Sequence, residues 1–184
     1  RERLATVGSK GYGPGQFTYP SGIAFSDAGE LYVCSMSGNR VQVFDRQGRC
    51  VRGFGKHGEE EGQFMIPGGL CFTSERNIVV IDRKMHRVQI VREDGTFVRA
   101  FGSKGNGDGE FQSMSDVCSG ADGSIAVLDE NAHRVQIFDG EGVFLRSFGS
   151  EGRGPGQFQR PVAIAAGRGG EIIVSDDMRK DVQI

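Results

Sequence analysis

Short segments of alternating or continuous apolar residues recur along the chain, separated by turn sequences. The segment 40–44 reads Arg-Val-Gln-Val-Phe and alternates at the period of two expected of a strand. The segment 30–35 is almost wholly apolar, which is typical of a strand covered on both faces. Turn residues at 27–29 and 45–48 separate these segments from two further expected strands at 20–26 and 50–54. We therefore expect four short antiparallel strands, and no stretch keeps the apolar spacing of a helix.

This group of four strands repeats every 47 residues. Gly-Gln-Phe stands at 15–17, 62–64 and 156–158, with Gly-Glu-Phe at 109–111. Arg-Val-Gln followed by Val or Ile stands at 40–43, 87–90 and 134–137, and returns as Asp-Val-Gln-Ile at 181–184. A repeat of this length predicts a stacked architecture, because one four-stranded sheet cannot bury both its faces alone. The sequence thus predicts an all-β β-propeller in which each repeat of four antiparallel strands builds one blade.

The phase of the repeat makes residues 1–184 a single propeller domain of four blades. The expected blades are 8–54, 55–101, 102–148 and 149–184, the last without its own outer strand. Residues 1–7 match an outer strand by phase. Two arrangements follow from this pattern: the N-terminal strand closes the ring by completing the last blade, or the four blades are a fragment of a six-bladed ring.

Composition and net charge argue against several classes of binding partner. A formal net charge of -2 argues against indiscriminate binding to a polyanion, although a local basic surface stays open. No apolar run is long enough to cross a bilayer, and we expect no membrane and no DNA as partner. The four cysteines stand where other copies carry small or apolar residues, and no Cys-x-x-Cys occurs. We interpret them as buried, reduced thiols, which favours a cytoplasmic location.

Functional residues are expected on one face of the propeller, which we call the top face. It carries the inter-blade loops, which run from the fourth strand of one blade to the first strand of the next, and the turns between second and third strands. These positions vary between copies, so they are free to carry recognition. The sharpest signal is the basic run Arg-Lys-Met-His-Arg at 83–87. The candidate ligand-binding residues are Tyr12, Tyr19, Lys56, His57, Arg83, Lys84, His86, Lys104, Arg153 and Arg160.

The sequence predicts no catalytic residues, no cofactor and no metal site. Asp116 stands on an innermost strand where other copies place Gly or Ala, and one carboxylate is too few for a metal or catalytic centre. We expect Asp116 to hydrogen-bond a neighbouring blade or channel water. His86 and His133 share a phase, but further zinc ligands are missing from the pattern. Aspartates 82, 129 and 176 end the second strands, where we expect them to fix the following turn.

The blade pattern resembles NHL repeats, and the third copy carries it most fully. That copy reads Leu128-Asp129, Asn131, His133 to Phe138 and Phe144 to Gly149. The resemblance covers nearly the whole chain and is closest to the C-terminal NHL domain of tripartite-motif proteins, whose propellers have six blades. It implies a non-catalytic platform that binds a protein partner, such as the substrate-selecting part of a ubiquitin ligase.

Two alternatives stay open beside protein recognition. The first is binding of single-stranded or stem-loop RNA by the basic top-face loops, as in post-transcriptional regulation. The resemblance allows it, because such propellers include RNA binders, while Glu59, Glu60 and Glu61 on the same face argue against it. The second is a metal-dependent propeller hydrolase or lyase, since related six-bladed propellers include such enzymes.

Overall fold

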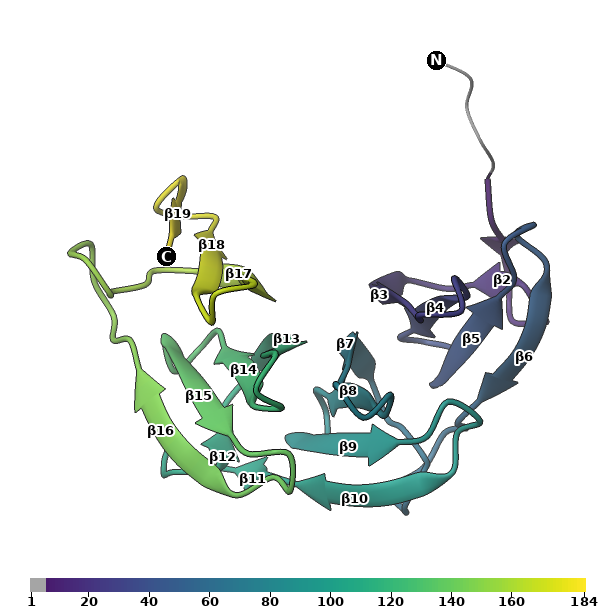
Figure 1. The fold of residues 1–184 in the computed structure, drawn as a ribbon, viewed down its shortest axis with the longest axis horizontal. Helices are drawn as coiled ribbons and strands as arrows, with labels where there is room; N and C mark the ends of the chain where they lie inside the picture. Colours follow the sequence, from purple (N-terminus) through teal and green to yellow (C-terminus); the bar gives the residue numbers. More distant parts are fainter. Residues whose placement is uncertain (1–5) are drawn as a thin grey trace.

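The computed structural model describes residues 6–184, and these contain strands, turns and loops but no helix. In this part of the chain there is accordingly no helix that could span a membrane. Four sheets of antiparallel strands follow one another along the chain and stand side by side in an open arc (Figure 1). The predicted all-β propeller architecture is confirmed.

Each sheet is a blade whose strands pair in chain order, and we name them inner, second, third and outer strand. Blade 1 consists of β3 (Pro20–Phe25), β4 (Leu31–Ser35), β5 (Arg40–Phe44) and β6 (Cys50–Phe54). Blade 2 consists of β7 (Pro67–Phe72), β8 (Ile78–Asp82), β9 (Arg87–Val91) and β10 (Phe97–Phe101). Blade 3 consists of β13 (Met114–Ser119), β14 (Ile125–Asp129), β15 (Arg134–Phe138) and β16 (Phe144–Phe148). Blade 4 has three strands, β17 (Pro161–Ala166), β18 (Ile172–Asp176) and β19 (Asp181–Gln183).

The inter-blade loops contain four further two-residue strands that the sequence analysis did not predict. In the first loop β1 (Ser9–Lys10) pairs with β2 (Gln16–Phe17), and in the third β11 (Ser103–Lys104) pairs with β12 (Glu110–Phe111), both in parallel. The other two loops form the same contact as single bridges, between His57 and Phe64 and between Glu151 and Phe158. All four loops therefore fold back on themselves in the same way.

The hydrophobic core lies between the blades. Three buried clusters fill the three junctions, and each combines apolar residues from the second and third strands of one blade with residues of the next. The phenylalanine of the Gly-Gln-Phe motif enters each junction from the following blade, as Phe64, Phe111 and Phe158. Cys34 and Cys118 are buried in these clusters as expected, whereas Cys50 and Cys71 are partly exposed. Stacking, rather than any single blade, thus buries the core.

The inner strands approach one another closely around the axis of the arc. A Cβ atom on Gly22 would lie 2.5 Å from the carbonyl oxygen of Gly68 on the next inner strand. A Cβ atom on Gly69 would lie 2.4 Å from the Asp116 carboxylate. Glycine is required at position 22, where a Cβ atom would meet backbone atoms of the next strand, whereas at position 69 the Asp116 carboxylate would have to move.

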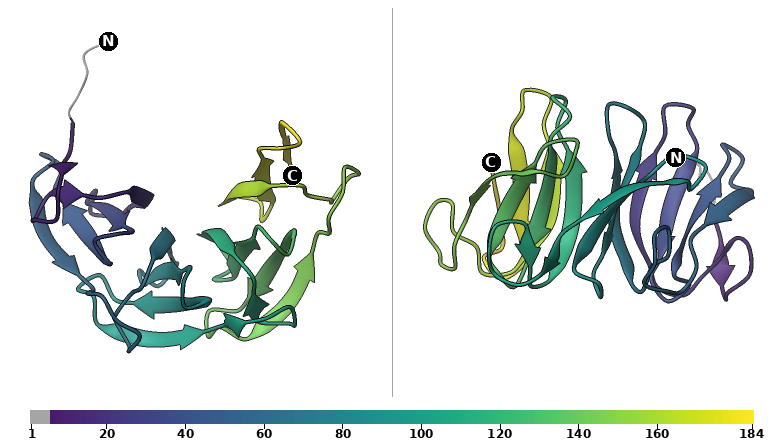
Figure 2. Two further views of the ribbon diagram at one scale, coloured as in Figure 1. Left: turned by 180° about the vertical axis from the view of Figure 1, so that it is seen from behind. Right: turned by 90° about the horizontal axis from the view of Figure 1, so that it is seen from below.

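Most of the outer strand predicted at 1–7 falls outside the described residues. Residues 1–5 lie outside the described part of the chain, and Thr6 to Gly8 form no strand. The side chain of Val7 lies beside the turn at Gly48 of blade 1, with Cγ2 3.1 Å from the position of a Cβ there. Blades 1 and 4 instead face each other across the open side of the arc (Figures 1 and 2). The described residues therefore form no closed ring.

Candidate functional site

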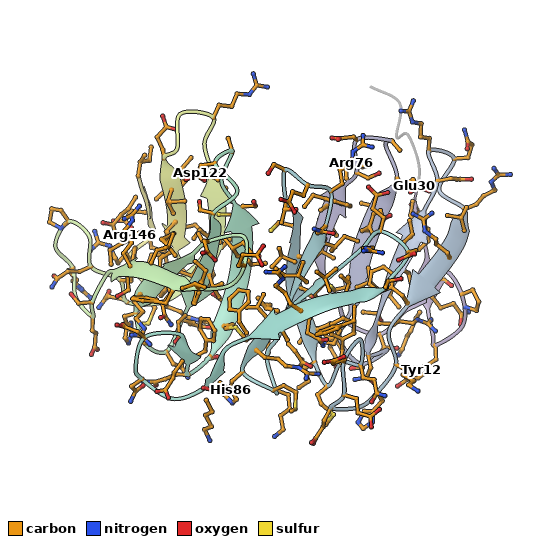
Figure 3. All side chains as sticks on the ribbon, turned by 60° about the horizontal axis from the view of Figure 1, so that its bottom comes forward. Tyr12, Glu30, Arg76, His86, Asp122 and Arg146 are labelled. Atoms are coloured by element: carbon orange, nitrogen blue, oxygen red, sulfur yellow. The ribbon has the colours of Figure 1, made fainter. Side chains whose placement is uncertain are left out.

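The two kinds of connection that make up the predicted top face are in contact in every blade. Each turn between second and third strands donates a backbone N–H to the inter-blade loop of the same blade, for example from Arg83 to the Ile66 carbonyl at 3.0 Å. Figure 3 shows Tyr12 and His86 on this side of the molecule and Glu30, Arg76 and Asp122 on the opposite side, which we call the bottom face. The two kinds of connection that were predicted to emerge together do so.

A glutamine on each third strand holds the loop in place. In blade 2 the Gln89 side chain accepts the N–H of Gly62 at 2.9 Å and donates to the Gln63 carbonyl at 2.6 Å. The same two bonds recur in the other blades through glutamines 42, 136 and 183. Gln89 is fully buried and the two backbone groups that it bonds are partly buried, so its side chain supplies partners where access of water is restricted.

An arginine at the start of each third strand adds a second anchor. Arg87 donates to the carbonyls of Glu60 and Gln63 at 3.0 Å each, and Arg134 makes the same two bonds in its blade. Arg40 donates instead to the carbonyls of Tyr12 and Gly13 in the loop of blade 1. Blade 4 has Asp181 at this position, and Arg179 takes over: it donates to the Gly154 carbonyl at 2.9 Å and pairs with Asp181 at 2.7 Å. Arg87 and Arg134 therefore belong to the scaffold that holds the loops.

The aspartates that end the second strands fix a different segment from the one expected. Asp129 accepts the N–H groups of Gln112 and Ser113, at 3.0 and 2.8 Å, which precede the inner strand of its blade. Asp82 and Asp176 make the equivalent bonds, and Asp176 alone also accepts N–H groups from the following turn. The prediction of a turn-fixing role is therefore wrong for Asp82 and Asp129. Their carboxylates hold the end of the inter-blade loop against the blade.

Blade 1 lacks this carboxylate, because Ser35 stands at the phase of Asp82. The loop residue Tyr19 there adopts a left-handed backbone, with φ of 57°, and its side chain is 73% exposed. Tyr12 in the same loop is 68% exposed. Two large aromatic side chains thus project from the top face of blade 1, where they are available to a partner.

The cationic candidates gather around blade 2. Lys56 and His57 lie in its inter-blade loop, Arg83 and Lys84 in its turn, and all four side chains are free of ion pairs and hydrogen bonds within residues 6–184. The turn also touches the loop that carries Lys104, because the His86 carbonyl lies 3.1 Å from the position of a Cβ on Gly102. The structure therefore brings the predicted basic residues of two loops and one turn to one region.

The arginines of the fourth blade are already engaged. Arg160 pairs with Glu130 at 3.3 Å and with Asp177 at 3.2 Å, which joins the turns of blades 3 and 4. Arg153 donates to the Gln159 side chain at 3.2 Å. Arg153 and Arg160 both lie on the predicted top face, but their guanidinium groups already contact other side chains of the protein. Their role in binding stays a prediction, as it does for the other eight candidates.

His86 and His133 occupy equivalent turn positions with a left-handed backbone, φ of 51° and 52°. Asn39 and Lys180 take the same conformation in the other two blades. Among the described residues no three His, Cys, Asp or Glu side chains stand in an arrangement that could hold a metal ion. The shared phase of the two histidines therefore reflects the geometry of a turn.

Asp116 bonds to the neighbouring blade, as expected. Its carboxylate accepts the N–H of Ile164 on β17 at 3.1 Å. Burial raises the pKa of this carboxyl, and the N–H groups of Ile164 and Val117 offset that rise in part. The carboxylate thus links the inner strands of blades 3 and 4.

We expect Asp116→Asn to stabilise the protein at neutral pH. A carboxyl whose pKa is raised by folding stabilises the fold fully below its unfolded pKa, and that contribution is lost as the pH rises through the folded value. Asparagine keeps an acceptor for Ile164 without the buried charge. Urea unfolding at pH about 4 and about 7 should show an advantage of the variant that grows with pH. An advantage that is independent of pH would contradict this account.

The repeat and its packing define the class of protein, which is a β-propeller of NHL-type repeats. A family model described as 6-bladed beta-propeller matches residues 59–129 and 118–183, and the chain belongs to this family.

Two curated proteins of Caenorhabditis elegans resemble parts of the chain. RING finger protein nhl-1 is 41% identical over 54 residues, and B-box type zinc finger protein ncl-1 is 45% identical over 42 residues. The matches cover 29% and 23% of this chain, and 6% and 5% of the length of the two relatives. Likeness to these proteins supports a recognition platform and leaves its partner open.

Solved structures share the fold at low identity. The streptogramin B lyase structure superposes with a TM-score of 0.68 at 16% identity, over 89% of this chain and 50% of that chain. Hydrazine synthase of Kuenenia stuttgartiensis superposes with a TM-score of 0.66 at 15% identity, over 96% of this chain and 46% of that chain. Since the neighbours include enzymes, the shared fold leaves open whether this propeller has an activity of its own.

Proposed function

We propose that this propeller is a non-catalytic recognition module that binds a protein partner through its top face. One observation carries the proposal: the scaffold and the recognition positions are separate sets of residues. Repeated residues, such as Gln89 with a counterpart in every blade and Asp129 with a counterpart in blades 2 and 4, are buried and form hydrogen bonds with the loops. Residues that differ between blades, such as Tyr12 and Lys84, are exposed on the surface that these bonds hold in place.

The relatives suggest the setting of the module. One is named a RING finger protein and the other a B-box type zinc finger protein. A propeller that selects the target of a tripartite-motif-like ubiquitin ligase fits both names. In that setting the exposed tyrosines of blade 1 supply the aromatic anchors that protein interfaces favour.

We expect the double variant Tyr12→Ala, Tyr19→Ala to capture about tenfold less partner protein, since aromatic anchors dominate interface energetics. Quantitative affinity capture from cell extract should compare it with the native chain and with Arg76→Glu, Arg92→Glu on the bottom face. A genuine partner is lost with the top-face variant and kept with the bottom-face variant. Equal capture by all three proteins would refute the proposal.

Binding of single-stranded RNA is a second candidate, favoured by the unpaired cations of blade 2. Filter binding of oligouridine RNA at several salt concentrations tests it. A steep salt dependence that Arg83→Glu, Lys84→Glu removes would support RNA. Absence of retention at low salt would eliminate it and leave the protein partner.

A further inference from the structure

A cavity of about 330 Å³ lies where the inner strands of blades 1, 2 and 3 begin, next to the top face. These strands converge on the centre of the arc (Figure 1). The volume is at the lower end of the range for ligand sites, which suits one or two residues of a peptide. Backbone of Gly68 and Gly69 forms part of the lining, and its polar side chains are Ser21, Arg83, Ser115 and Asp116.

Arg83 brings an uncompensated positive charge to this cavity. Its side chain is half-buried and forms no ion pair or hydrogen bond within residues 6–184. At the same phase blades 3 and 4 carry Glu130 and Asp177, whose carboxylates are already paired, and blade 1 carries Met36. The guanidinium of Arg83 is therefore free to bind a ligand.

Glycine at position 68 makes room for this arginine at the cavity. A Cβ atom on Gly68 would lie 3.1 Å from Cδ of Arg83 and 3.0 Å from Cγ1 of Ile81. The aliphatic part of the Arg83 side chain thus lies against the first residues of β7, and packing on one side restricts its orientation. A positioned guanidinium loses less conformational entropy on binding than a fully solvated one.

Asp116 is the other ionisable group of the lining, and it opposes the guanidinium only weakly. One carboxylate oxygen accepts the N–H of Ile164, and among the described residues no cation pairs with this side chain. Burial raises the pKa of its carboxyl and so favours the neutral form, whereas a guanidinium keeps its charge at every physiological pH. The cavity therefore attracts anions.

The geometry of the donors favours a carboxylate over a phosphate. A single guanidinium offers a planar pair of N–H groups that matches the two oxygens of a carboxylate. A second negative charge would have no further cation in the lining and would be repelled by Asp116. The hydroxyl of Ser115 contacts the carbonyls of Leu128 and Pro161 only at 3.5 Å each, so it can turn to a ligand at little cost.

We propose that this cavity binds one carboxylate of the protein partner, held by the Arg83 guanidinium and the Ser115 hydroxyl. The inference rests on the proposed function, because it takes the carboxylate to be part of a protein that docks on the top face. Two sources share this chemistry: an acidic side chain and the C-terminal carboxylate of a chain.

The test is a nuclear magnetic resonance titration of the nitrogen-15-labelled 184-residue protein at neutral pH. The α-amide of N-acetylglutamate represents an acidic side chain, and the matching glutamine compound is its neutral control. N-acetylglycylglycine represents a C-terminus, and its amide is the neutral control. Inorganic phosphate is titrated separately. The amide signals of Gly68, Gly69 and Ser115 should shift with a carboxylate probe and stay in place with both neutral controls. The carboxylate probe that binds more tightly identifies the source.

Arg83→Met should weaken binding of the carboxylate probe by about tenfold, since it removes a charge-assisted hydrogen bond. The turn should accommodate methionine, because blade 1 carries Met36 at this phase. Asp116→Asn should bind the probe at least as tightly as the native protein, because it removes a carboxylate from the same cavity. Arg76→Met makes the same change on the bottom face and should leave binding unaltered (Figure 3).

Absence of shifts at the cavity, or equal shifts with the neutral controls, would overturn the proposal. Tighter binding of phosphate than of either carboxylate would assign the cavity to phosphate groups instead. Weaker binding by Asp116→Asn would mean that the ligand is a cation, and unchanged binding by Arg83→Met would place the probe elsewhere.

Failure of this site and failure of the proposed function give different results. The probe titration needs no partner, so a negative result removes the carboxylate site and leaves capture through Tyr12 and Tyr19 as it stands. Conversely, probe binding that depends on Arg83, together with equal capture by the tyrosine variant and the native chain, would keep the site and refute the docking surface.

Discussion

Phe111→Ala should lower the free energy of unfolding by about 3–5 kcal/mol, the usual range for removing a buried aromatic ring. Phe111 is completely buried in the cluster between blades 2 and 3, with its ring 5.8 Å from that of Phe138. The loss combines the transfer of the ring from water with the cavity that remains. Urea unfolding followed by far-ultraviolet circular dichroism would measure it, since the chain has no tryptophan.

Phe17→Ala is the matched control, because the two residues share a phase but not a neighbour. Phe17 lies near Phe44, at 5.5 Å between rings, and is half-buried at the open end of the arc. Its removal should cost about 1 kcal/mol, since part of its surface already contacts water. Equal losses for the two variants would mean that burial between blades is not the source of the effect.

Gln89→Ala should cost about 1–3 kcal/mol, because it leaves the part-buried N–H of Gly62 without a partner. The carbonyl of Gln63 also loses the Gln89 side chain, which bonds it at 2.6 Å, but it keeps the bond from Arg87. The variant should also loosen the inter-blade loop of blade 2, which carries Lys56 and His57. Unfolding in urea gives the energy, and hydrogen exchange at Gly62 gives the loop opening.

Gln183→Ala removes the same two bonds at the end of the arc. There the bonded group of Gly156 is exposed, so water can replace the side chain, and we expect a loss of about 1 kcal/mol or less. A large loss at Gln183 together with a small one at Gln89 would show that the glutamines do not act by satisfying buried backbone groups.

The sequence predicted the strands well because two physical signals coincide there. Alternation at period two and turn residues at fixed phases place Arg40–Phe44 and Cys50–Phe54 with the bounds that the structure has, and the other two strands of the blade to within one residue. The propeller follows from repetition alone, because each blade needs a neighbour. The repeated glutamine in the third strand was a missed signal: a polar residue kept in every copy of a buried strand implies a buried partner.

The residues that escaped prediction depend on contacts across distant segments. Asp129 was assigned to the turn that follows it in sequence, but its partners Gln112 and Ser113 lie before it, across the blade. Tyr19 was predicted on the binding face, but its left-handed backbone, in the blade where Ser35 stands at the phase of Asp82, appears only in the folded structure. The sequence predicted which face carries the binding loops. Which side chains on that face lack internal hydrogen bonds and ion pairs depends on the folded structure.

The guanidinium that anchors each inter-blade loop can come from two places in the chain. In blade 3 it belongs to Arg134, and in blade 4 Arg179 reaches the corresponding carbonyl from two residues upstream of Asp181. In homologues, substitutions at these two positions of the repeat should therefore compensate for each other. Where a blade lacks the arginine at one position, we expect an arginine at the other. A sequence profile that scores each repeat position independently would rate the fourth blade as a poor match to the repeat, although this blade keeps the arginine–carbonyl hydrogen bond.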